Sequence, residues 1–222
     1  MAHDSPGPLR NTPVELVGSY PATLPTLGLP EVAFAGRSNV GKSSALNCLW
    51  NRRGLARVSR TPGRTQLINL FRAGNRAVFA DLPGYGYAHV PDAVRAEWKP
   101  MIERYLAERA ALVLVVVLID IRRDPQEMDG ALMYGLTEAR IPSVVVATKI
   151  DKLGKQQRSR QLAALRRAFH LPAGQPIGLS SVTTEGRDAV WDAIERAVAA
   201  AAPAPEPDAT GAEISPETPG RA

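Results

Sequence analysis

The sequence predicts an α/β fold in three layers, with a mostly parallel six-stranded sheet between two layers of helices. Short β-branched and apolar runs alternate with longer helical patterns along the chain, which is the order of strand and helix in such folds. Two runs, LVLVVVLI at 112–119 and SVVVA at 143–147, are apolar at almost every position. This is typical of central parallel strands that helices cover on both faces.

Each element follows from its own stretch of sequence. The predicted strands are Val32–Ala35, Leu67–Phe71, Ala77–Ala80, Leu112–Ile119, Ser143–Ala147 and Ile177–Leu179. The predicted helices are Ser43–Trp50, Pro91–Ala111, Pro125–Ala139, Gln156–Phe169 and Gly186–Ala202. Too few residues separate the second and third strands for a helical crossover, and they include Gly74 and Asn75. These two strands should form an antiparallel hairpin at the sheet edge.

Composition indicates one folded domain with two flanks. The chain has 222 residues, of which 45% are hydrophobic, so a wholly disordered protein is excluded. Eleven of the 19 prolines lie in residues 1–30 and 203–222. We therefore expect an N-terminal extension at 1–30, a domain at 31–202 and a disordered proline-, alanine- and acid-rich tail at 203–222.

The cysteine content and the net charge indicate which cellular compartment and which kind of binding partner to expect. Cys48 is the one cysteine, which fits a reducing compartment and a buried core thiol. The first residues lack a signal-peptide core, and the longest apolar run is too short to cross a bilayer. We expect a cytoplasmic protein without membrane insertion. The net charge of +5 favours an anionic partner, or else a solvated arginine-rich face.

The strongest motif is GRSNVGKS at residues 36–43, which matches G-x-x-x-x-G-K-[ST] between a predicted strand and a predicted helix. Gly36 and Gly41 allow backbone N–H groups to curl around phosphates. Lys42 would reach the β and γ phosphate oxygens, and Ser43 would offer its hydroxyl to Mg²⁺. The motif predicts a phosphate site but fits an ATPase, a kinase or a GTPase.

TKID at residues 148–151 favours guanine as the base. It places Asp151 at the carboxyl end of a central strand, where ligands bind in open α/β sheets. The Asp151 carboxylate could accept from guanine N1 and the exocyclic amine, while the Lys149 stem packs along the ring. Adenine has no such donor pair. Alone, the motif also fits a strand end capped by an aspartate.

Three further segments fit the same nucleotide. In DLPG at 81–84, Asp81 would hold Mg²⁺ through water and the Gly84 N–H would meet the γ-phosphate, although such residues are common in turns. In LSSVTTEG at 179–186, backbone N–H groups around Ser180–Val182 could contact guanine O6, or the segment is simply a helix N-cap. In TPGRTQ at 61–66, the hydroxyl of Thr65, preferred over Thr61, could complete the Mg²⁺ shell, or the segment is a Pro-Gly turn.

In this order the five segments resemble the Ras-like GTPase superfamily over about residues 31–201. Within it, GRSNVGKSS, TPGRTQLINLF, DLPGYGYA and TKIDK resemble the EngB/YihA family of bacterial GTPases, relatives of the Era, EngA and TrmE group. The resemblance implies a P-loop G domain that binds GTP or GDP with Mg²⁺ and hydrolyses GTP. It also implies a role in late assembly of the large ribosomal subunit and in normal division and septation. The alternative is a nucleotide-gated scaffold acting directly at the division septum.

The resemblance also assigns residues. It implies nucleotide contacts at Gly36, Arg37, Ser38, Asn39, Val40, Gly41, Lys42, Ser43, Gly63, Arg64, Thr65, Gln66, Leu67, Asp81, Leu82, Pro83, Gly84, Thr148, Lys149, Ile150, Asp151, Leu179, Ser180 and Ser181. The catalytic roles fall to Lys42, Thr65 and Gly84, and the Mg²⁺ ligands are Ser43 and Thr65. The expected partners are the large ribosomal subunit and its rRNA, and we expect a monomer without a DNA partner.

One departure from Ras-type enzymes concerns hydrolysis. Tyr85 follows DLPG where those enzymes have the glutamine that orients the attacking water. A phenol cannot replace that amide, so we expect slow unaided hydrolysis and help from a metal ion, another chain or RNA. Several related GTPases use an asparagine at the position of Asn39 to hold K⁺. The alternative is that Asn39 only stabilises the loop.

An arginine-rich stretch is the candidate binding site for the expected RNA partner. Five arginines lie within thirteen residues that contain no acid: Arg52, Arg53, Arg57, Arg60 and Arg64. They would contact RNA phosphates in a GTP-sensitive way, or they form a solvated face. Other basic pairs are Arg122–Arg123 and Arg166–Arg167. A phosphotransferase is disfavoured, since TKID explains guanine selection and no acceptor domain is visible.

Overall fold

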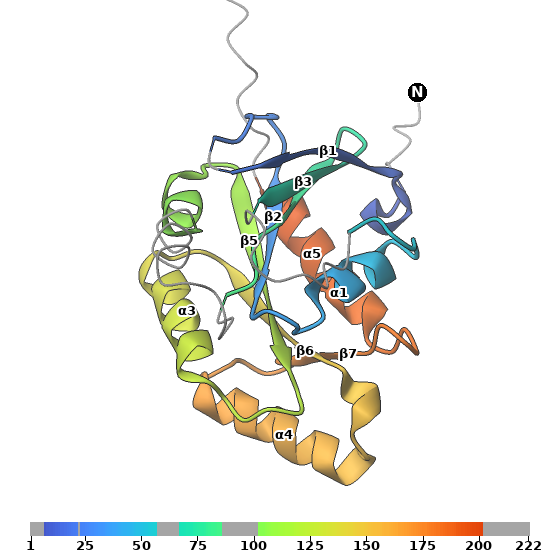
Figure 1. Ribbon diagram of the computed structural model, residues 1–222, viewed down its shortest axis with the longest axis vertical. Helices are drawn as coiled ribbons and strands as arrows, with labels where there is room; N and C mark the ends of the chain where they lie inside the picture. Colours follow the sequence, from blue (N-terminus) through green and yellow to red (C-terminus); the bar gives the residue numbers. More distant parts are fainter. Residues whose placement is uncertain (1–6, 22, 57–66, 86–101, 202–222) are drawn as a thin grey trace, which may run out of the picture.

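The computed structural model describes residues 7–21, 23–56, 67–85 and 102–201 (Figure 1). Within them, one seven-stranded sheet has the order β1-β3-β4-β2-β5-β6-β7. Its strands are β1 (Val14–Tyr20), β2 (Glu31–Gly36), β3 (Ile68–Ala73), β4 (Ala77–Asp81), β5 (Leu112–Asp120), β6 (Ser143–Thr148) and β7 (Ile177–Leu179). The helices are α1 (Lys42–Leu49), α3 (Glu127–Glu138), α4 (Lys155–Ala168) and α5 (Arg187–Ala200), with a helical segment at 102–108 and the short turns η1 (Leu9–Asn11) and η2 (Ile150–Lys152).

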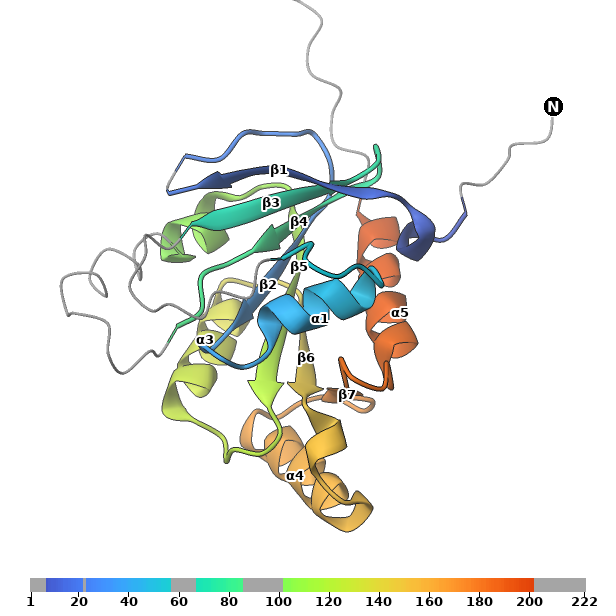
Figure 2. The same ribbon diagram turned by 45° about the vertical axis from the view of Figure 1, so that its right-hand side comes forward.

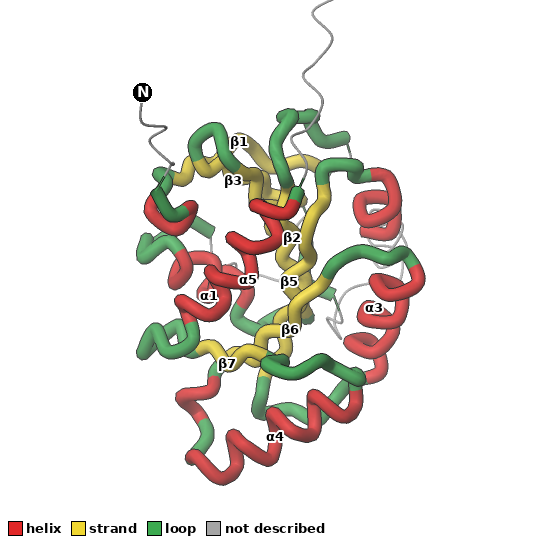
Figure 3. The backbone as a smooth tube through the Cα atoms, turned by 180° about the vertical axis from the view of Figure 1, so that it is seen from behind, coloured by secondary structure: helices red, strands yellow, loops and turns green. Residues whose placement is uncertain are grey.

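Helices cover both faces of the sheet, as the continuous apolar strands predict. The helices α1 and α5 lie on one face, and α3 and α4 lie on the other (Figures 1 and 3). In β5 and β6 the side chains of Val115, Val117 and Val146 are fully buried. The α/β fold in three layers is therefore confirmed, and Cys48 is a buried thiol as expected.

The central strands are parallel and end at one edge of the sheet. The strand β2 pairs in parallel with β4 and β5, and β5 and β6 are also parallel neighbours (Figure 2). Because parallel strands point the same way, the residues that follow β2, β4, β5 and β6 meet at their carboxyl ends. All the predicted nucleotide segments that the structure describes lie at this edge.

The sheet has one strand more than the sequence predicts. The hairpin of β3 and β4 is antiparallel as expected, but it is not at the edge. Instead β1 pairs antiparallel with β3, from Val14 opposite Ala73 to Tyr20 opposite Ile68. Residues 14–20 belong to the segment interpreted as an N-terminal extension, so part of that segment completes the sheet. Prolines on either side and the exposed Leu16 hide the strand pattern.

The predicted helix Pro91–Ala111 can be compared only in its second half. Residues 102–108 are helical, and the helix stops before Arg109, which donates to the Glu31 carboxylate at the start of β2. Residues 91–101 lie outside the described part of the chain. Among the described residues no helix has the length and apolar character needed to span a membrane.

Candidate functional site

The loop at 36–43 joins β2 to α1 at the carboxyl edge of the sheet (Figure 2). Gly36 is required by close packing, because a Cβ there would lie 2.8 Å from the Leu118 carbonyl oxygen. Gly41 has a φ of 104°, which glycine adopts without strain, and α1 begins directly after it. No side chain caps the N-terminus of α1. The loop therefore has the backbone that a phosphate site requires.

Lys42 and Asp81 form a largely buried ion pair between this loop and the end of β4. The other carboxylate oxygen of Asp81 accepts a hydrogen bond from Asn69 Nδ2 at 3.3 Å. Ser43 occupies the next position in the first turn of α1 and is half-buried. A cation and a carboxylate thus come together from two elements that the sequence separates by almost forty residues, and Ser43 follows the cation directly in α1.

The DLPG segment lies against the same loop. The Leu82 N–H donates to the Phe34 carbonyl oxygen at 3.1 Å, which continues the pairing of β4 with β2. The Ser38 hydroxyl donates to the Gly84 carbonyl oxygen at 3.1 Å. Added to Gly84, a Cβ would lie 3.1 Å from Ser38 backbone atoms, so only glycine fits without movement. The structure therefore brings Asp81 through Gly84 next to residues 36–43, with Pro83 buried.

TKID contacts the phosphate loop through its first two side chains. The Thr148 hydroxyl donates to the Val40 carbonyl oxygen at 2.7 Å. Lys149 Nζ donates to the Asn39 carbonyl oxygen at 2.7 Å and to Asp120 Oδ2 at 2.9 Å. These bonds hold the end of β6 on the loop that follows β2. Ile150 is buried beneath them.

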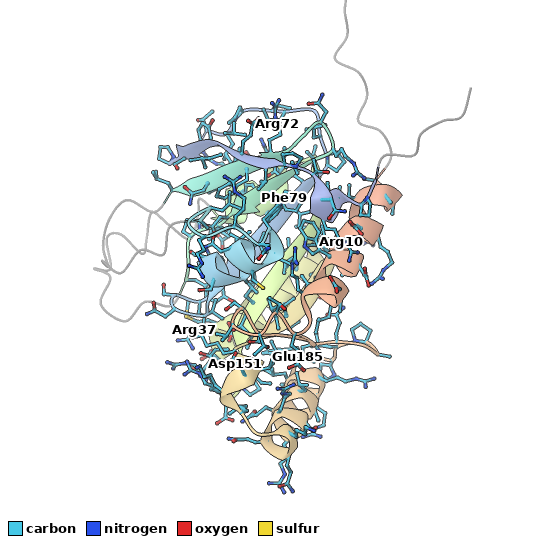
Figure 4. The ribbon with its side chains drawn as sticks, turned by 90° about the vertical axis from the view of Figure 1, so that its right-hand side faces the viewer. Arg10, Arg37, Arg72, Phe79, Asp151 and Glu185 are labelled. Carbon is cyan, nitrogen blue, oxygen red and sulfur yellow. The ribbon has the colours of Figure 1, made fainter. Side chains whose placement is uncertain are left out.

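Asp151 is oriented by the loop after β7. Its Oδ1 accepts a hydrogen bond from the Ser180 hydroxyl at 2.8 Å, and this bond, more than any other contact, lowers the pKa of Asp151. Ser180 is fully buried and also accepts from the Val182 and Thr183 N–H groups. The carboxylate is therefore ionised and held beyond the carboxyl end of β6 (Figure 4).

The loop after β7 uses some of the N–H groups that the sequence assigns to guanine O6. The Ser180 N–H donates to the Glu185 carbonyl oxygen at 3.0 Å, and the Val182 N–H donates to Ser180 Oγ. Leu179 is buried, whereas Ser181 is exposed. The loop ends at Gly186, where only glycine fits, because a Cβ there would lie 1.8 Å from the Gly178 carbonyl oxygen.

Asp120 and Arg122 belong to the site, although sequence reasoning did not select them for it. Asp120 is 5% exposed at the end of β5 and accepts two hydrogen bonds from the Arg122 guanidinium at 2.9 and 2.7 Å. Burial opposes ionisation, but hydrogen bonds from Arg122 and Lys149 outweigh it and lower the pKa of Asp120 to about 2. Asp120, like Asp151, lies at the carboxyl end of a central apolar strand, and this position could have indicated it.

Some predicted residues lie outside the described chain. They are Thr61, Gly63, Arg64, Thr65 and Gln66 of the TPGRTQ segment, and Arg57 and Arg60 of the basic stretch. Leu67 is half-buried just before β3. Of the other arginines, Arg52 and Arg53 are both exposed, and Arg52 donates to the Val14 carbonyl oxygen at 2.6 Å. Through this hydrogen bond Arg52 contacts the first residue of β1, so part of its role is structural.

Comparisons with known proteins agree with this geometry. Residues 31–149 match the family model of the 50S ribosome-binding GTPases. A probable GTP-binding protein EngB of Geobacter metallireducens is 50% identical over 183 residues, which is 82% of this chain and 90% of that protein. The corresponding protein of Geobacter sp. strain M21 is 48% identical over 187 residues, or 84% and 87% of the two chains.

Solved structures share the fold. A crystal structure of a probable GTP-binding protein EngB matches with a TM-score of 0.65 at 24% identity, over 76% of this chain and 98% of that one. Aquifex aeolicus Era bound to GDP and AlF4⁻ matches with a TM-score of 0.61 at 22% identity, over 76% and 56%. With the family match and the close relatives, these findings show that the chain belongs to the EngB family of GTP-binding proteins and is a P-loop GTPase.

Proposed function

We propose that this chain is a GTP- and Mg²⁺-dependent switch, slow in hydrolysis, that acts in assembly of the large ribosomal subunit. One observation supports the proposed nucleotide site more than any other. Lys149 of TKID donates a hydrogen bond to the Asn39 carbonyl oxygen of the phosphate loop at 2.7 Å. This contact supports the proposal that the base-recognition motif and the phosphate motif form one nucleotide site. In this proposal the chain works as a cytoplasmic monomer, with a domain at 31–202 that β1 completes.

The donor atoms present suit Mg²⁺. The Ser43 hydroxyl would offer a hard oxygen ligand, which this ion prefers, and the Asp81 carboxylate would hold the ion through water. The described residues contain no cluster of three or more His, Cys, Asp or Glu that could hold a metal alone. Phosphate oxygens and water would therefore complete the shell, together with Thr65. When bound, Mg²⁺ would neutralise charge on the phosphates.

The remaining side chains have separate tasks in this proposal. Lys42 would exchange its pairing with Asp81 for phosphate oxygens, and backbone N–H groups of residues 36–43 would cradle the phosphates. Asp151, held by Ser180, would accept from guanine N1 and the exocyclic amine. Lys149 would lie along the ring while its ammonium stays on the loop. The Gly84 N–H would approach the γ-phosphate.

Slow hydrolysis is supported by the position of Tyr85. Its side chain is buried and its hydroxyl is bound to Asp129, so it does not orient water. We expect the protein alone to turn over GTP no faster than about 10⁻³ s⁻¹, the range of unstimulated Ras. Asn39 has a φ of 64°, which asparagine tolerates and which favours a loop-stabilising role. Stimulation by K⁺ over Na⁺, lost in Asn39→Ala, would instead assign it a K⁺ ion.

The ribosomal role is supported by the match to a family of 50S ribosome-binding GTPases and by the basic charge. The test is co-sedimentation with large subunits in a GTP analogue or GDP, over a range of salt concentrations. Binding that needs the GTP analogue and falls steeply with salt is expected, because each neutralised phosphate releases counterions. Arg53→Glu combined with Arg57→Glu should abolish it and leave GDP affinity intact. Recovery of division proteins without ribosomes would favour the septal scaffold.

A further inference from the structure

Tyr85 is buried between the phosphate loop and α3, directly after the DLPG segment. Its side chain is 6% exposed, and its hydroxyl donates a hydrogen bond to Asp129 Oδ1 at 2.8 Å. Asp129 is 2% exposed and lies in the first turn of α3. Hydrogen bonds to buried carboxylates are among the stronger ones, and breaking one leaves a costly unpaired acceptor. This bond therefore fixes the end of DLPG to α3.

The backbone of Tyr85 is bonded to the phosphate loop in both directions. Its N–H donates to the Gly36 carbonyl oxygen at 3.2 Å, and its carbonyl oxygen accepts from the Ser38 N–H at 2.8 Å. The two bonds form a one-residue parallel bridge between Arg37 and Tyr85. Gly84 lies directly before this bridge, with its carbonyl oxygen bound to the Ser38 hydroxyl. Any shift of Tyr85 would therefore shift Gly84.

The charges around Tyr85 keep its hydroxyl a donor. Burial raises the pKa of Tyr85, and the neighbouring Asp129 raises it further, so the phenol stays protonated. Burial also raises the pKa of Asp129, while the Tyr85 hydrogen bond and the charge of Arg37 oppose that shift. Arg37 Nε and Nη1 are buried and have no hydrogen-bond partner in the described part of the chain. Arg37, Tyr85 and Asp129 thus form one polar cluster that joins the ends of β2 and β4 to α3.

We infer that Tyr85 is a positioning residue for the γ-phosphate, which acts by holding Gly84 against the phosphate loop through its hydrogen bond to Asp129. The inference rests on the proposed function, in which the Gly84 N–H meets the γ-phosphate. GDP has no γ-phosphate, so loss of the Tyr85–Asp129 bond should weaken GTP binding and spare GDP binding. The same bond connects the γ-phosphate contact to α3.

The experiment compares affinities for GDP and for a non-hydrolysable GTP analogue. Tyr85→Phe keeps the ring and removes the donor, and we expect about tenfold weaker binding of the GTP analogue with GDP affinity changed less than twofold. Asp129→Ala should behave in the same way. Asp129→Asn keeps an acceptor oxygen for the phenol and should restore near wild-type binding of the analogue.

Tyr105→Phe is the matched control. Tyr105 is equally buried and also donates to a buried carboxylate, that of Glu31, but at the opposite end of β2. Its removal should lower the melting temperature without changing the ratio of GTP-analogue to GDP affinity. A change in that ratio in Tyr85→Phe and Asp129→Ala, but not in Tyr105→Phe, is the expected result.

Two outcomes would overturn the inference. One is an equal loss of GDP and GTP-analogue affinity in Tyr85→Phe and Asp129→Ala, which would make the bond a general support of the fold. The other is an unchanged ratio in both variants while the wild type binds both nucleotides. If Tyr85→Phe does not fold, the Asp129→Ala and Asp129→Asn pair decides alone. Failure of the wild type to bind either nucleotide would instead reject the proposed function.

Discussion

Lys149 reaches from the end of β6 to the phosphate loop, where its ammonium group donates to the Asn39 carbonyl oxygen at 2.7 Å. The same nitrogen donates to Asp120 at the end of β5. One side chain therefore connects the carboxyl ends of two central strands to the loop after a third. The base and phosphate halves of the proposed site are held together by this lysine.

Lys149→Met tests that connection, because methionine keeps most of the apolar stem and lacks the ammonium. We expect release of a fluorescent GDP to become about tenfold faster, because the variant loses the two hydrogen bonds that the ammonium donates to Asn39 and Asp120. Stopped-flow displacement measures the rate. Lys155→Met is the control, because Lys155 is exposed at the start of α4 and is not among the residues assigned to the site. Equal acceleration in both variants would contradict a special role for Lys149.

Asp120 should make the stability of the protein depend on pH in acid. Its pKa is about 2 in the folded chain against an ordinary value of 3.8. Ionised Asp120 therefore adds about 2 kcal/mol to the free energy of unfolding above about pH 5, and this is lost as the pH falls toward 2. In Asp120→Asn, urea unfolding should show a smaller loss of stability across this range. Asp124→Asn, at an exposed neighbouring position, should keep the wild-type pH dependence.

Local motifs predict the site because each carries its own backbone requirement. GRSNVGKS needs its glycines at positions 36 and 41, and the structure shows why for each of them. The all-apolar strands predict where Asp151 emerges, since a buried parallel strand must end at the ligand edge. These features depend on residues that are close together in the sequence, so they can be interpreted without the fold.

Long-range pairings could not be predicted in the same way. The strand β1 depends on β3, about fifty to sixty residues away, and its half-exposed face gives little alternation. Asp120 bonds to Lys149, which lies 29 residues further along the chain, and Tyr85 bonds to Asp129 of α3, which lies 44 residues further along. In each case the local sequence is compatible with several partners, and only tertiary packing selects one.

Asp151→Asn should change base preference from guanine toward xanthine. The carboxylate accepts from the guanine amine in our proposal, whereas an amide can donate to the carbonyl that xanthine has there. Competition between GTP and XTP measures the change, and loss of the charged contact should cost about 2–3 kcal/mol in GTP binding. Ser180→Ala removes the hydroxyl that holds Asp151. It should weaken GDP binding but keep the preference for guanine. An unchanged preference in Asp151→Asn would reject the base assignment.

Arg10 should contribute to stability more than an ordinary surface arginine does. It bonds η1 to one face of α5, with contacts to Asp192 at 2.6 Å and Glu195 at 2.7 Å, and its side chain is 24% exposed. Arg10→Ala should lower the free energy of unfolding by about 1–2 kcal/mol. Arg72→Ala, which removes a more exposed pair with Glu15, should cost less than about 0.5 kcal/mol. Thermal unfolding measures the loss of stability in both variants. An equal loss in Arg10→Ala and Arg72→Ala would contradict the special role of Arg10.

Lys42 and Ser43, which are neighbours in the phosphate loop, should act on different groups. Lys42 pairs with Asp81 and would supply charge to the phosphates, whereas Ser43 would supply an oxygen to Mg²⁺. Both Lys42→Ala and Ser43→Ala should weaken binding of a GTP analogue by about 2 kcal/mol or more. Only Ser43→Ala should recover as the Mg²⁺ concentration rises, because raising the ion concentration offsets a weakened metal site by mass action. Ser44→Ala, one residue further along α1, is the matched control and should bind as the wild type does. If a Mg²⁺ titration affects both Lys42→Ala and Ser43→Ala alike, the phosphate and metal roles are not divided between these two residues.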